Sequence, residues 1–278
     1  MPDARLPDSL YHYTNTAGLT GILESRSLWA TDLRFLNDAS EVNYPRGLLT
    51  AAVDELKSQP PVDTSTLDRL ALIEQLSRVL FPATFAACMC AEADLLSQWR
   101  AYGDADGRYA IGLSRERLRD ISFEQNFALL PVKYRVADQK QLLITALTDA
   151  LEYLAQPPVQ GALKAADKNT VIAMALSDAL LEVKNPHFRE EAEWRLCRTA
   201  WGPATSDKLT HFRTHAGEII PYQEISLVDE PSGASALDIV VVGPSAHADS
   251  RATAVHQLLQ HHGLLDVSVS ISEIPLRA

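Results

Sequence analysis

The 278-residue chain is poor in the residues that redox and membrane proteins use most. It has three cysteines, Cys88, Cys90 and Cys197, and no Cys-x-x-Cys pair. A small, odd number with two members in one apolar run indicates reduced thiols inside a cytosolic protein. No apolar run approaches the roughly 18 residues of a bilayer-spanning helix. The N-terminus shows no secretory signal, so we expect a cytoplasmic protein without membrane contact.

Positive charge is also scarce, because 25 Lys and Arg stand against 36 Asp and Glu, for a net charge of −11. This balance argues against a broad basic surface for nucleic acid. Several arginines lie close in sequence between Arg100 and Arg119, and we interpret them as a solvated helix face, with a local basic cleft as the alternative.

The motifs of several enzyme classes are missing. The chain has no GxGxxG or GxxxxGK[ST] sequence, so neither Rossmann nor P-loop nucleotide binding is indicated. It also lacks the GxSxG of serine hydrolases and the HExxH of zinc proteases, and we expect no metal site.

Hydrophobic patterning predicts a mixed fold of class α+β, with a mainly antiparallel sheet and peripheral helices. Strands are expected at Ser9–Thr14, Leu28–Thr31, Ala83–Cys90, Tyr109–Leu113, Phe127–Val136, from Trp194, and at Leu209–His215, Glu218–Val228, Leu237–Val242 and Leu265–Ile271. Helices are expected at Thr16–Ser25, Val42–Leu56, Leu67–Leu80, Leu95–Tyr102, Leu142–Leu154, Ala162–Leu181 and Ala248–Gln260. Residues of about 138–185 read as a helical insertion in a single domain spanning 1–278.

A crowded acidic segment is the most informative feature. Glu190, Glu191 and Glu193 occupy three of four successive positions, just before the strand residues Trp194 and Leu196. Carboxylates held this close repel one another unless a cation or a substrate uses them. If the segment is extended, Glu191 and Glu193 share one face and form a plausible catalytic pair. The alternative is a solvated helix end that runs into a strand.

Aromatic residues accompany two further candidates. His12 lies between two tyrosines in the first strand, where one ring nitrogen can bind a sugar hydroxyl while the protein fixes the other. Trp99 and Tyr102 are three residues apart on one helical face and can wall a planar ligand. The alternatives are a structural histidine and ordinary core packing.

Taken together, these segments resemble a bacterial domain-of-unknown-function family that is similar to the ADP-ribosyltransferase superfamily. The resemblance covers roughly residues 9–275, and it is carried by Leu10–Thr14, Gly21–Ala30, Leu36–Glu41, Leu96–Tyr102, Glu191–Leu196 and Ile239–Pro244. It implies a β core of ADP-ribosyltransferase type with NAD as substrate.

The resemblance also implies roles for individual residues. Glu193 would steady the ribosyl cation as nicotinamide leaves, and Glu191 would orient the acceptor. The NAD-binding residues would be His12, Tyr13, Thr14, Asn37, Trp99 and Tyr102. Arginines such as Arg26, Arg34 or Arg100 would hold the phosphates.

The expected function is therefore transfer of ADP-ribose from NAD to an unknown acceptor, a protein or a nucleic acid. The habit of the family adds the hypothesis of a toxin or anti-phage effector. Two alternatives stay open: an NAD glycohydrolase, and a non-catalytic module of the same fold that binds a nucleotide, a nucleic acid or a protein. The sequence does not indicate the oligomeric state.

Overall fold

The computed structural model describes residues 6–36, 43–59, 63–77, 84–102, 107–156, 168–199 and 209–275. Its strands are β1 (Ser9–Thr14), β2 (Ser27–Asp32), β3 (Thr84–Cys90), β4 (Tyr109–Ser114), β5 (Ala128–Pro131), β6 (Glu193–Thr199), β7 (His211–His215), β8 (Glu218–Ser226), β9 (Leu237–Val242) and β10 (Ser268–Ile271). The α-helices are α1 (Thr16–Ser25), α2 (Asn43–Lys57), α3 (Thr64–Ser77), α4 (Leu96–Tyr102), α5 (Arg115–Glu124), α6 (Val136–Ala155), α7 (Lys168–Leu181) and α8 (Ala248–His261). Two short 3₁₀ helices are η1 (Leu33–Phe35) and η2 (Pro186–Glu191). The predicted class, mixed α+β with a mostly antiparallel open sheet, is confirmed.

The sheet forks at β3. Its main path runs β10-β9-β4-β1-β3-β2-β8-β7, while β6 pairs with β3 and β5 off this path. Along one edge β3 pairs with β6 over its whole length. On the other edge it pairs with β2 at Phe85 and Ala86, and with β1 only at Cys90. Residues Ala87 to Met89 therefore lie in a gap where β1 and β2 diverge, and this gap positions the site.

The first turn of the chain shows why β1 leads into α1 so tightly. The side chain of Asn15 accepts a hydrogen bond of 2.9 Å from the backbone N–H of Gly18 and so caps the helix. Glycine is required at position 18 because a Cβ there would lie 1.9 Å from the Thr14 hydroxyl. The helix ends at Arg26, which adopts a left-handed backbone with φ of 52°.

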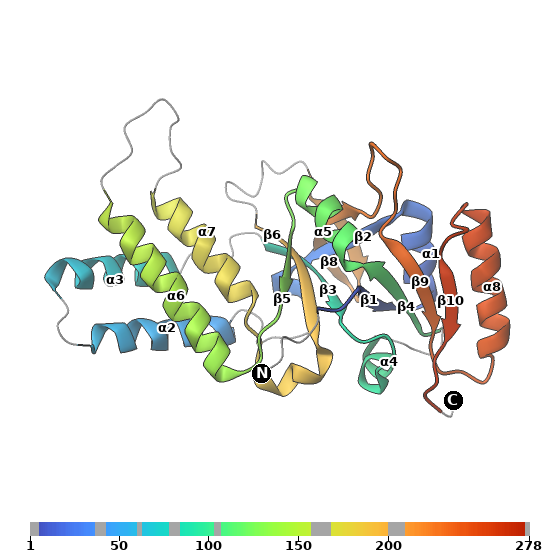
Figure 1. The fold of residues 1–278 in the computed structure, drawn as a ribbon, viewed down its shortest axis with the longest axis horizontal. Coiled ribbons are helices and arrows are strands. Elements are labelled where there is room, and N and C mark those ends of the chain that lie inside the picture. The colour runs from blue at the N-terminus through green and yellow to red at the C-terminus, as the bar shows by residue number, and fades with distance from the viewer. Residues whose placement is uncertain are drawn as a thin grey trace.

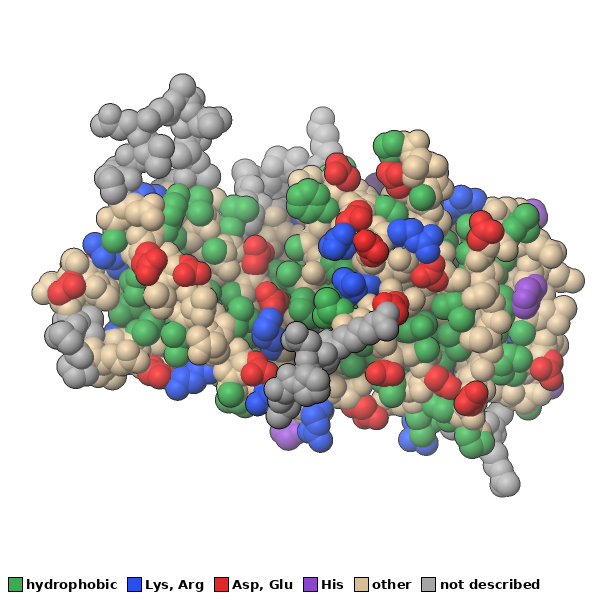
Figure 2. Space-filling model, in the orientation of Figure 1, with side chains coloured by type: hydrophobic (Ala, Val, Ile, Leu, Met, Phe, Trp, Pro, Cys, Tyr) green, Lys and Arg blue, Asp and Glu red, His purple; other side chains and the backbone are tan. Residues whose placement is uncertain are grey.

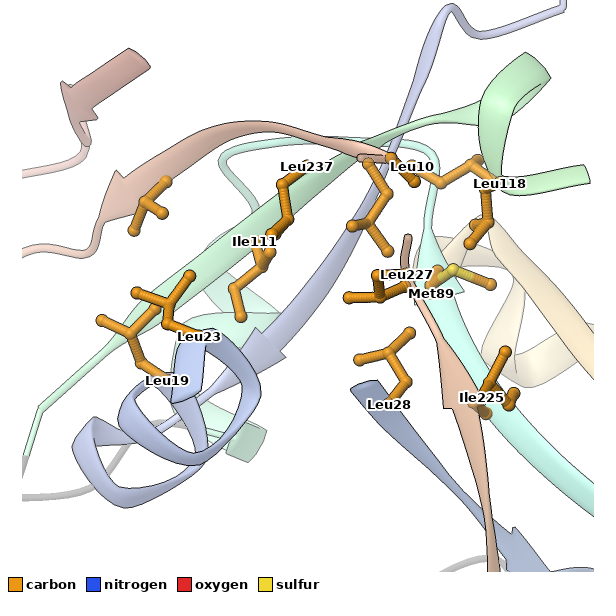
Figure 3. Packing of buried hydrophobic residues seen from close by; sticks show 14 of the residues in the cluster. Leu10, Leu19, Leu23, Leu28, Met89, Ile111, Leu118, Ile225, Leu227 and Leu237 are labelled. Atoms are coloured by element: carbon orange, nitrogen blue, oxygen red, sulfur yellow. The ribbon is translucent and has the colours of Figure 1, made fainter. Parts of the chain in front are cut away.

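The main hydrophobic core lies on the face of the sheet that α1, α5 and α8 cover, and it bridges both arms of the fork. Figure 3 shows Leu19 and Leu23 of α1 on the side of Ile111, while Met89 lies beside Leu227, nearer to Leu28 and Ile225. Each fully buried leucine stabilises the fold by roughly 1.5–3 kcal/mol.

A second core belongs to a helical group at one end of the molecule (Figure 1). It joins α6 and α7, which lie in the predicted insertion, to α2 and α3 from much earlier in the chain. The group packs onto the sheet through Ala86 and Cys197. The helical region is therefore assembled from two separate parts of the sequence.

Three details differ from expectation. The strand expected over Phe127–Val136 is only β5: its pairing with β6 extends to the N–H of Val132, which donates to Glu193, and the chain turns into α6 at Val136. The closing strand starts at Ser268, three residues later than expected. Arg115, Arg117 and Arg119 lie on a helix, α5, as the interpretation of their run implies, but this helix is missing from the expected elements.

Charges of both signs are interspersed on the face shown in Figure 2, where acidic and basic side chains meet over α5. Arg117 and Arg119 pair there with Asp238 and Asp120. Such exposed pairs contribute about 0–1 kcal/mol each. Within the described ranges, no helix combines the length and apolarity needed to cross a membrane.

Candidate functional site

A cavity of about 820 Å³ opens at the fork of the sheet. Its size lies in the range of small-molecule sites, roughly 300–1,000 Å³. α1 lines one side with Ala17, Gly18 and Gly21, and the segment from Lys184 to Glu193 lines another. A Cβ at Gly21 would meet no atom within 4 Å, so this part of the helix faces open space.

The cavity brings together most of the site residues that the sequence predicts. His12, Tyr13, Thr14, Tyr102, Glu191 and Glu193 all line it. Trp99 does not, and Asn37 lies outside the described residues, as does most of the Leu36–Glu41 loop. The fold thus joins β1 to the beginning of β6, which the sequence separates widely.

His12 stands in the gap of the fork. Its Nδ1 lies 3.0 Å from the carbonyl oxygen of Cys88, the part of β3 that neither β1 nor β2 pairs. A carbonyl only accepts hydrogen bonds, so Nδ1 carries a proton. Loss of contact with water lowers the pKa of His12 more than its bond to Cys88 raises it, and the imidazole is neutral at pH 7. Nε2 is then a hydrogen-bond acceptor without a partner among the described residues, and it suits a ligand hydroxyl.

Tyr13 and Trp99 form a structural unit beside the cavity. Their rings meet edge to face with centroids 4.6 Å apart. The Tyr13 hydroxyl donates to the carbonyl of Glu92 and accepts from the N–H of Leu95, and burial raises its pKa. Trp99 is 1% exposed, and its Nε1 donates to Asp94 at 2.6 Å. The expectation that Trp99 stacks on a ligand is corrected by this burial.

Phe188 lines the cavity, whereas Trp99 does not. Tyr102, at the end of α4, is 42% exposed, and α4 packs against η2, which carries Phe188. Both rings line the cavity near Glu191. Burial raises the pKa of Tyr102 to about 12, so its hydroxyl is neutral at physiological pH. The aromatic wall is therefore built from Tyr102 and Phe188.

The acidic segment is held by two cations. Nζ of Lys184 lies 2.6 Å from Glu191 and 2.7 Å from Glu193, and Nε of Arg195 lies 2.7 Å from Glu193. Lys184, Glu193 and Arg195 are each less than 10% exposed, while Glu191 is 27% exposed. The two cations therefore offset the repulsion that is expected between the carboxylates.

The backbone of this segment is not extended throughout, which corrects the expected geometry. Glu191 ends η2, and Ala192 adopts a left-handed conformation with φ of 42° before β6 begins at Glu193. Glu191 therefore reaches Lys184 by a bend in the chain rather than by strand alternation. Glu193 and Arg195 share a strand face, and Nε of Arg195 donates to Glu193.

Glu193 is ionised over the whole physiological range. Burial alone would raise its pKa, but the nearby charges of Arg195 and Lys184 outweigh burial and lower the pKa to about 2. Its two oxygens accept three N–H bonds, two from Arg195 and one from Lys184, and the Cys88 thiol hydrogen-bonds to the same carboxylate. A carboxylate has about four acceptor positions, so the protein fills them. Glu193 cannot serve as a general acid, but it can present fixed negative charge.

The opposite end of the cavity has a different character. Trp29, Thr31 and Arg213 line it, and β3, β2 and β8 separate β7 from β6. Nη2 of Arg213 donates to the Thr31 hydroxyl at 3.1 Å, and the guanidinium lies 5.7 Å from the Trp29 ring centre. Arg213 is thus the arginine that faces the cavity.

The arginines named from the sequence are placed elsewhere. Arg26 donates to the carbonyl of His262, and Arg34 forms a bidentate salt bridge with Asp32. Arg100 does not line the cavity. The expectation that these three side chains hold phosphates is corrected, because two bind protein groups and none borders the space.

Sequence reasoning missed several cavity residues, among them Lys184, Phe188, Cys88, Arg213 and Trp29. Of these, only Cys88 was noted individually in the sequence, as a thiol in the apolar run that forms β3. Lys184 has no motif around it, and only the fold places it between two glutamates. In the described part of the chain, no group of three or more His, Cys, Asp or Glu side chains is arranged for a metal ion.

Residues 98–196 match a family model described as a protein of unknown function (DUF2971). The matched stretch runs from α4 into β6, so it includes Tyr102, Lys184, Glu191 and Glu193, but not His12. Likeness to a family of unknown function agrees with that part of the expectation. No curated protein matches the chain.

Proposed function

We propose that the protein cleaves NAD and transfers ADP-ribose to an acceptor. The observation that carries this proposal is that neutral His12, with an open acceptor nitrogen, and ionised Glu193 line one cavity. A mixed, mostly antiparallel sheet is compatible with the ADP-ribosyltransferase fold, and that finer assignment is part of the proposal.

The cavity suits such a substrate in three respects. Nε2 of His12 accepts a bond from a ribose hydroxyl. Tyr102 and Phe188 offer rings against which a planar nicotinamide can pack. Glu191 and Glu193 supply negative charge close to these rings, where the cationic pyridinium of NAD would lie.

The chemistry balances without an added reagent. The bond between the nicotinamide nitrogen and ribose C1′ breaks, and its electron pair neutralises the pyridinium. Positive charge develops on the sugar, as in glycoside cleavage, and the fixed carboxylate of Glu193 stabilises it. The acceptor then bonds to C1′ and loses a proton, which Glu191, the more exposed carboxylate, is placed to take.

Cys88 explains how a filled carboxylate still contacts substrate. Its thiol is the weakest of the donors to Glu193, since S–H groups bond more weakly than N–H groups. We infer that a ribose hydroxyl replaces the thiol, while Arg195 and Lys184 keep the carboxylate in place. Substrate binding then costs no rearrangement of the ion cluster.

One observation favours a second candidate, a nucleotide-binding module without catalysis. The charges of Glu191 and Glu193 are matched by Lys184 and Arg195, so the cluster is close to neutral. A neutral cluster exerts a weaker field on a developing cation than an unpaired carboxylate does. In this candidate the cluster only shapes the cavity.

Nicotinamide release from NAD distinguishes the two. The purified protein is incubated with NAD, with and without a cell extract as the source of acceptor, alongside Glu193→Gln. The matched control is Glu182→Gln, which also removes a carboxylate paired with a lysine but lies outside the cavity.

We expect release by the wild type and by Glu182→Gln, and a loss of at least 100-fold in Glu193→Gln, of the order that removing one electrostatic group from an active site produces. Release that needs extract indicates a transferase, and release without extract indicates hydrolysis. If NAD raises the melting temperature but neither wild type nor variants release nicotinamide, the binding module replaces the enzyme.

A further inference from the structure

The far end of the cavity carries an arginine whose bonding capacity is not used. Nε of Arg213 is buried and donates to no group in the described ranges. Its Nη2 has a single partner, the Thr31 hydroxyl. A buried donor left unpaired costs free energy, and such groups in native proteins call for an explanation such as a ligand. Guanidinium groups are especially suited to phosphate, which accepts from two N–H groups at once.

An aromatic surface adjoins this arginine. Trp29 is 45% exposed although Tyr222 packs against it with ring centres 4.4 Å apart, and His211 continues the row. The ladder explains the grouping, because Thr31 pairs with Tyr222 and Tyr222 pairs with His211 across neighbouring strands. Residues directly opposite in antiparallel strands share a face of the sheet. Large exposed indole surface beside a cation is the pattern on which bases stack.

We propose that Trp29 and Arg213 form a subsite for a nucleotide, with the base stacked on Trp29 and the phosphate bound by Arg213. This inference rests on the proposed function for the source of the nucleotide. The subsite takes either the adenylate half of NAD or a nucleotide of an acceptor. The chemistry is the same in both cases. Glu224 lies opposite Trp29 in the ladder and is exposed to solvent, so its negative charge would repel a phosphate bound nearby.

Titration calorimetry with AMP and adenosine tests the subsite directly. The wild type is compared with Arg213→Gln, and with Arg119→Gln as the control, since Arg119 pairs with Asp120 and lies outside the cavity. We expect AMP to bind the wild type at least tenfold more tightly than adenosine. In Arg213→Gln this difference disappears, while adenosine affinity stays within twofold and so shows that the site is intact.

Two further variants test the parts. Trp29→Ala weakens AMP and adenosine equally, by at least fivefold, because both carry the base. Glu224→Gln strengthens AMP binding and leaves adenosine unchanged, since it removes a repelling charge. If Arg213→Gln weakens both ligands equally, or neither, Arg213 does not bind phosphate and the proposal is overturned. Absence of AMP binding to the wild type overturns it as well.

Competition identifies the source of the nucleotide. Displacement of AMP by NAD assigns the subsite to the donor. Displacement by 5′-phosphorylated oligo-dA, with NAD bound at the same time, assigns it to an acceptor. Neither readout involves nicotinamide release, so failure of NAD cleavage leaves the subsite standing, and loss of the subsite leaves the test of Glu193 intact.

Discussion

The two ends of the cavity hold their charges in opposite ways. Near β6, Glu191, Glu193, Lys184 and Arg195 pair with one another and are mostly buried. Near β7, Arg213 has one hydrogen-bond partner and a buried Nε that has none among the described residues. Paired charges hold the carboxylates in one geometry, whereas a donor without a partner has N–H capacity left for a ligand. On the proposed function, this difference means that the acidic end positions the substrate and the Arg213 end binds its phosphate.

The largest expected effect comes from removing Lys184 from the ion cluster. Lys184→Met leaves Glu191 and Glu193 facing each other with one cation fewer, and losing one partner of a buried ion pair costs about 3–5 kcal/mol. Urea unfolding measures the change. Lys140→Met is the control, because Lys140 is 54% exposed in its pair with Glu55 and should cost at most about 1 kcal/mol. Equal effects in the two variants would mean that the cluster is not a stabilising unit.

Acid unfolding tests the same end by titration. The pKa of Glu193 falls from 4.5 to about 2 on folding, so its contribution is fully present above about pH 4.5 and is lost as pH drops toward 2. We expect the wild type to lose up to about 3 kcal/mol across this window through Glu193. Glu193→Gln should show a shallower dependence in denaturant titrations at each pH. Parallel curves would show that Glu193 has no depressed pKa.

Trp99 and Tyr102 separate packing from binding. Trp99→Phe removes a buried hydrogen bond to Asp94 and should cost about 1–3 kcal/mol while leaving NAD affinity unchanged. Tyr102→Ala should do the reverse, with little loss of stability and at least fivefold weaker NAD binding, since its ring is exposed to the cavity. Thermal unfolding and calorimetry give the two quantities. If Trp99→Phe weakened NAD binding as much as Tyr102→Ala does, Trp99 would be a ligand contact after all.

His12 gives the most selective effect. His12→Asn keeps an N–H near the carbonyl of Cys88 but removes the nitrogen that accepts from a ligand. We expect NAD to bind about tenfold more weakly, corresponding to about 1.4 kcal/mol, with stability changed by less than that. An unchanged dissociation constant would show that Nε2 makes no contact with NAD.

The sequence predicted the individual elements better than their junctions. Hydrophobic patterning predicted β1 at Ser9–Thr14 and α1 at Thr16–Ser25 with the bounds that the structure has, because such signals are local. The fork at β3 depends on which strands reach Phe85, Ala86 and Cys90 from elsewhere in the chain. Local patterns carry no information about such pairing.

The same limit applies to the site. His12 and Glu193 stood out because their neighbours form recognisable segments, and the fold places both on the cavity. Lys184 and Arg213 were missed because a single cation in a polar stretch resembles any surface residue. Trp99 was misplaced because helical spacing cannot show which side of α4 faces the core.

The most direct test is the electron density of a crystal that contains a non-cleavable NAD analogue. The account predicts the nicotinamide between Tyr102 and Phe188, a ribose hydroxyl within hydrogen-bond distance of His12 Nε2 and the Glu193 carboxylate, and the ion pairs of Lys184 and Arg195 unchanged. Density for the analogue outside this cavity, or a ribose that contacts neither His12 nor Glu193, would contradict it.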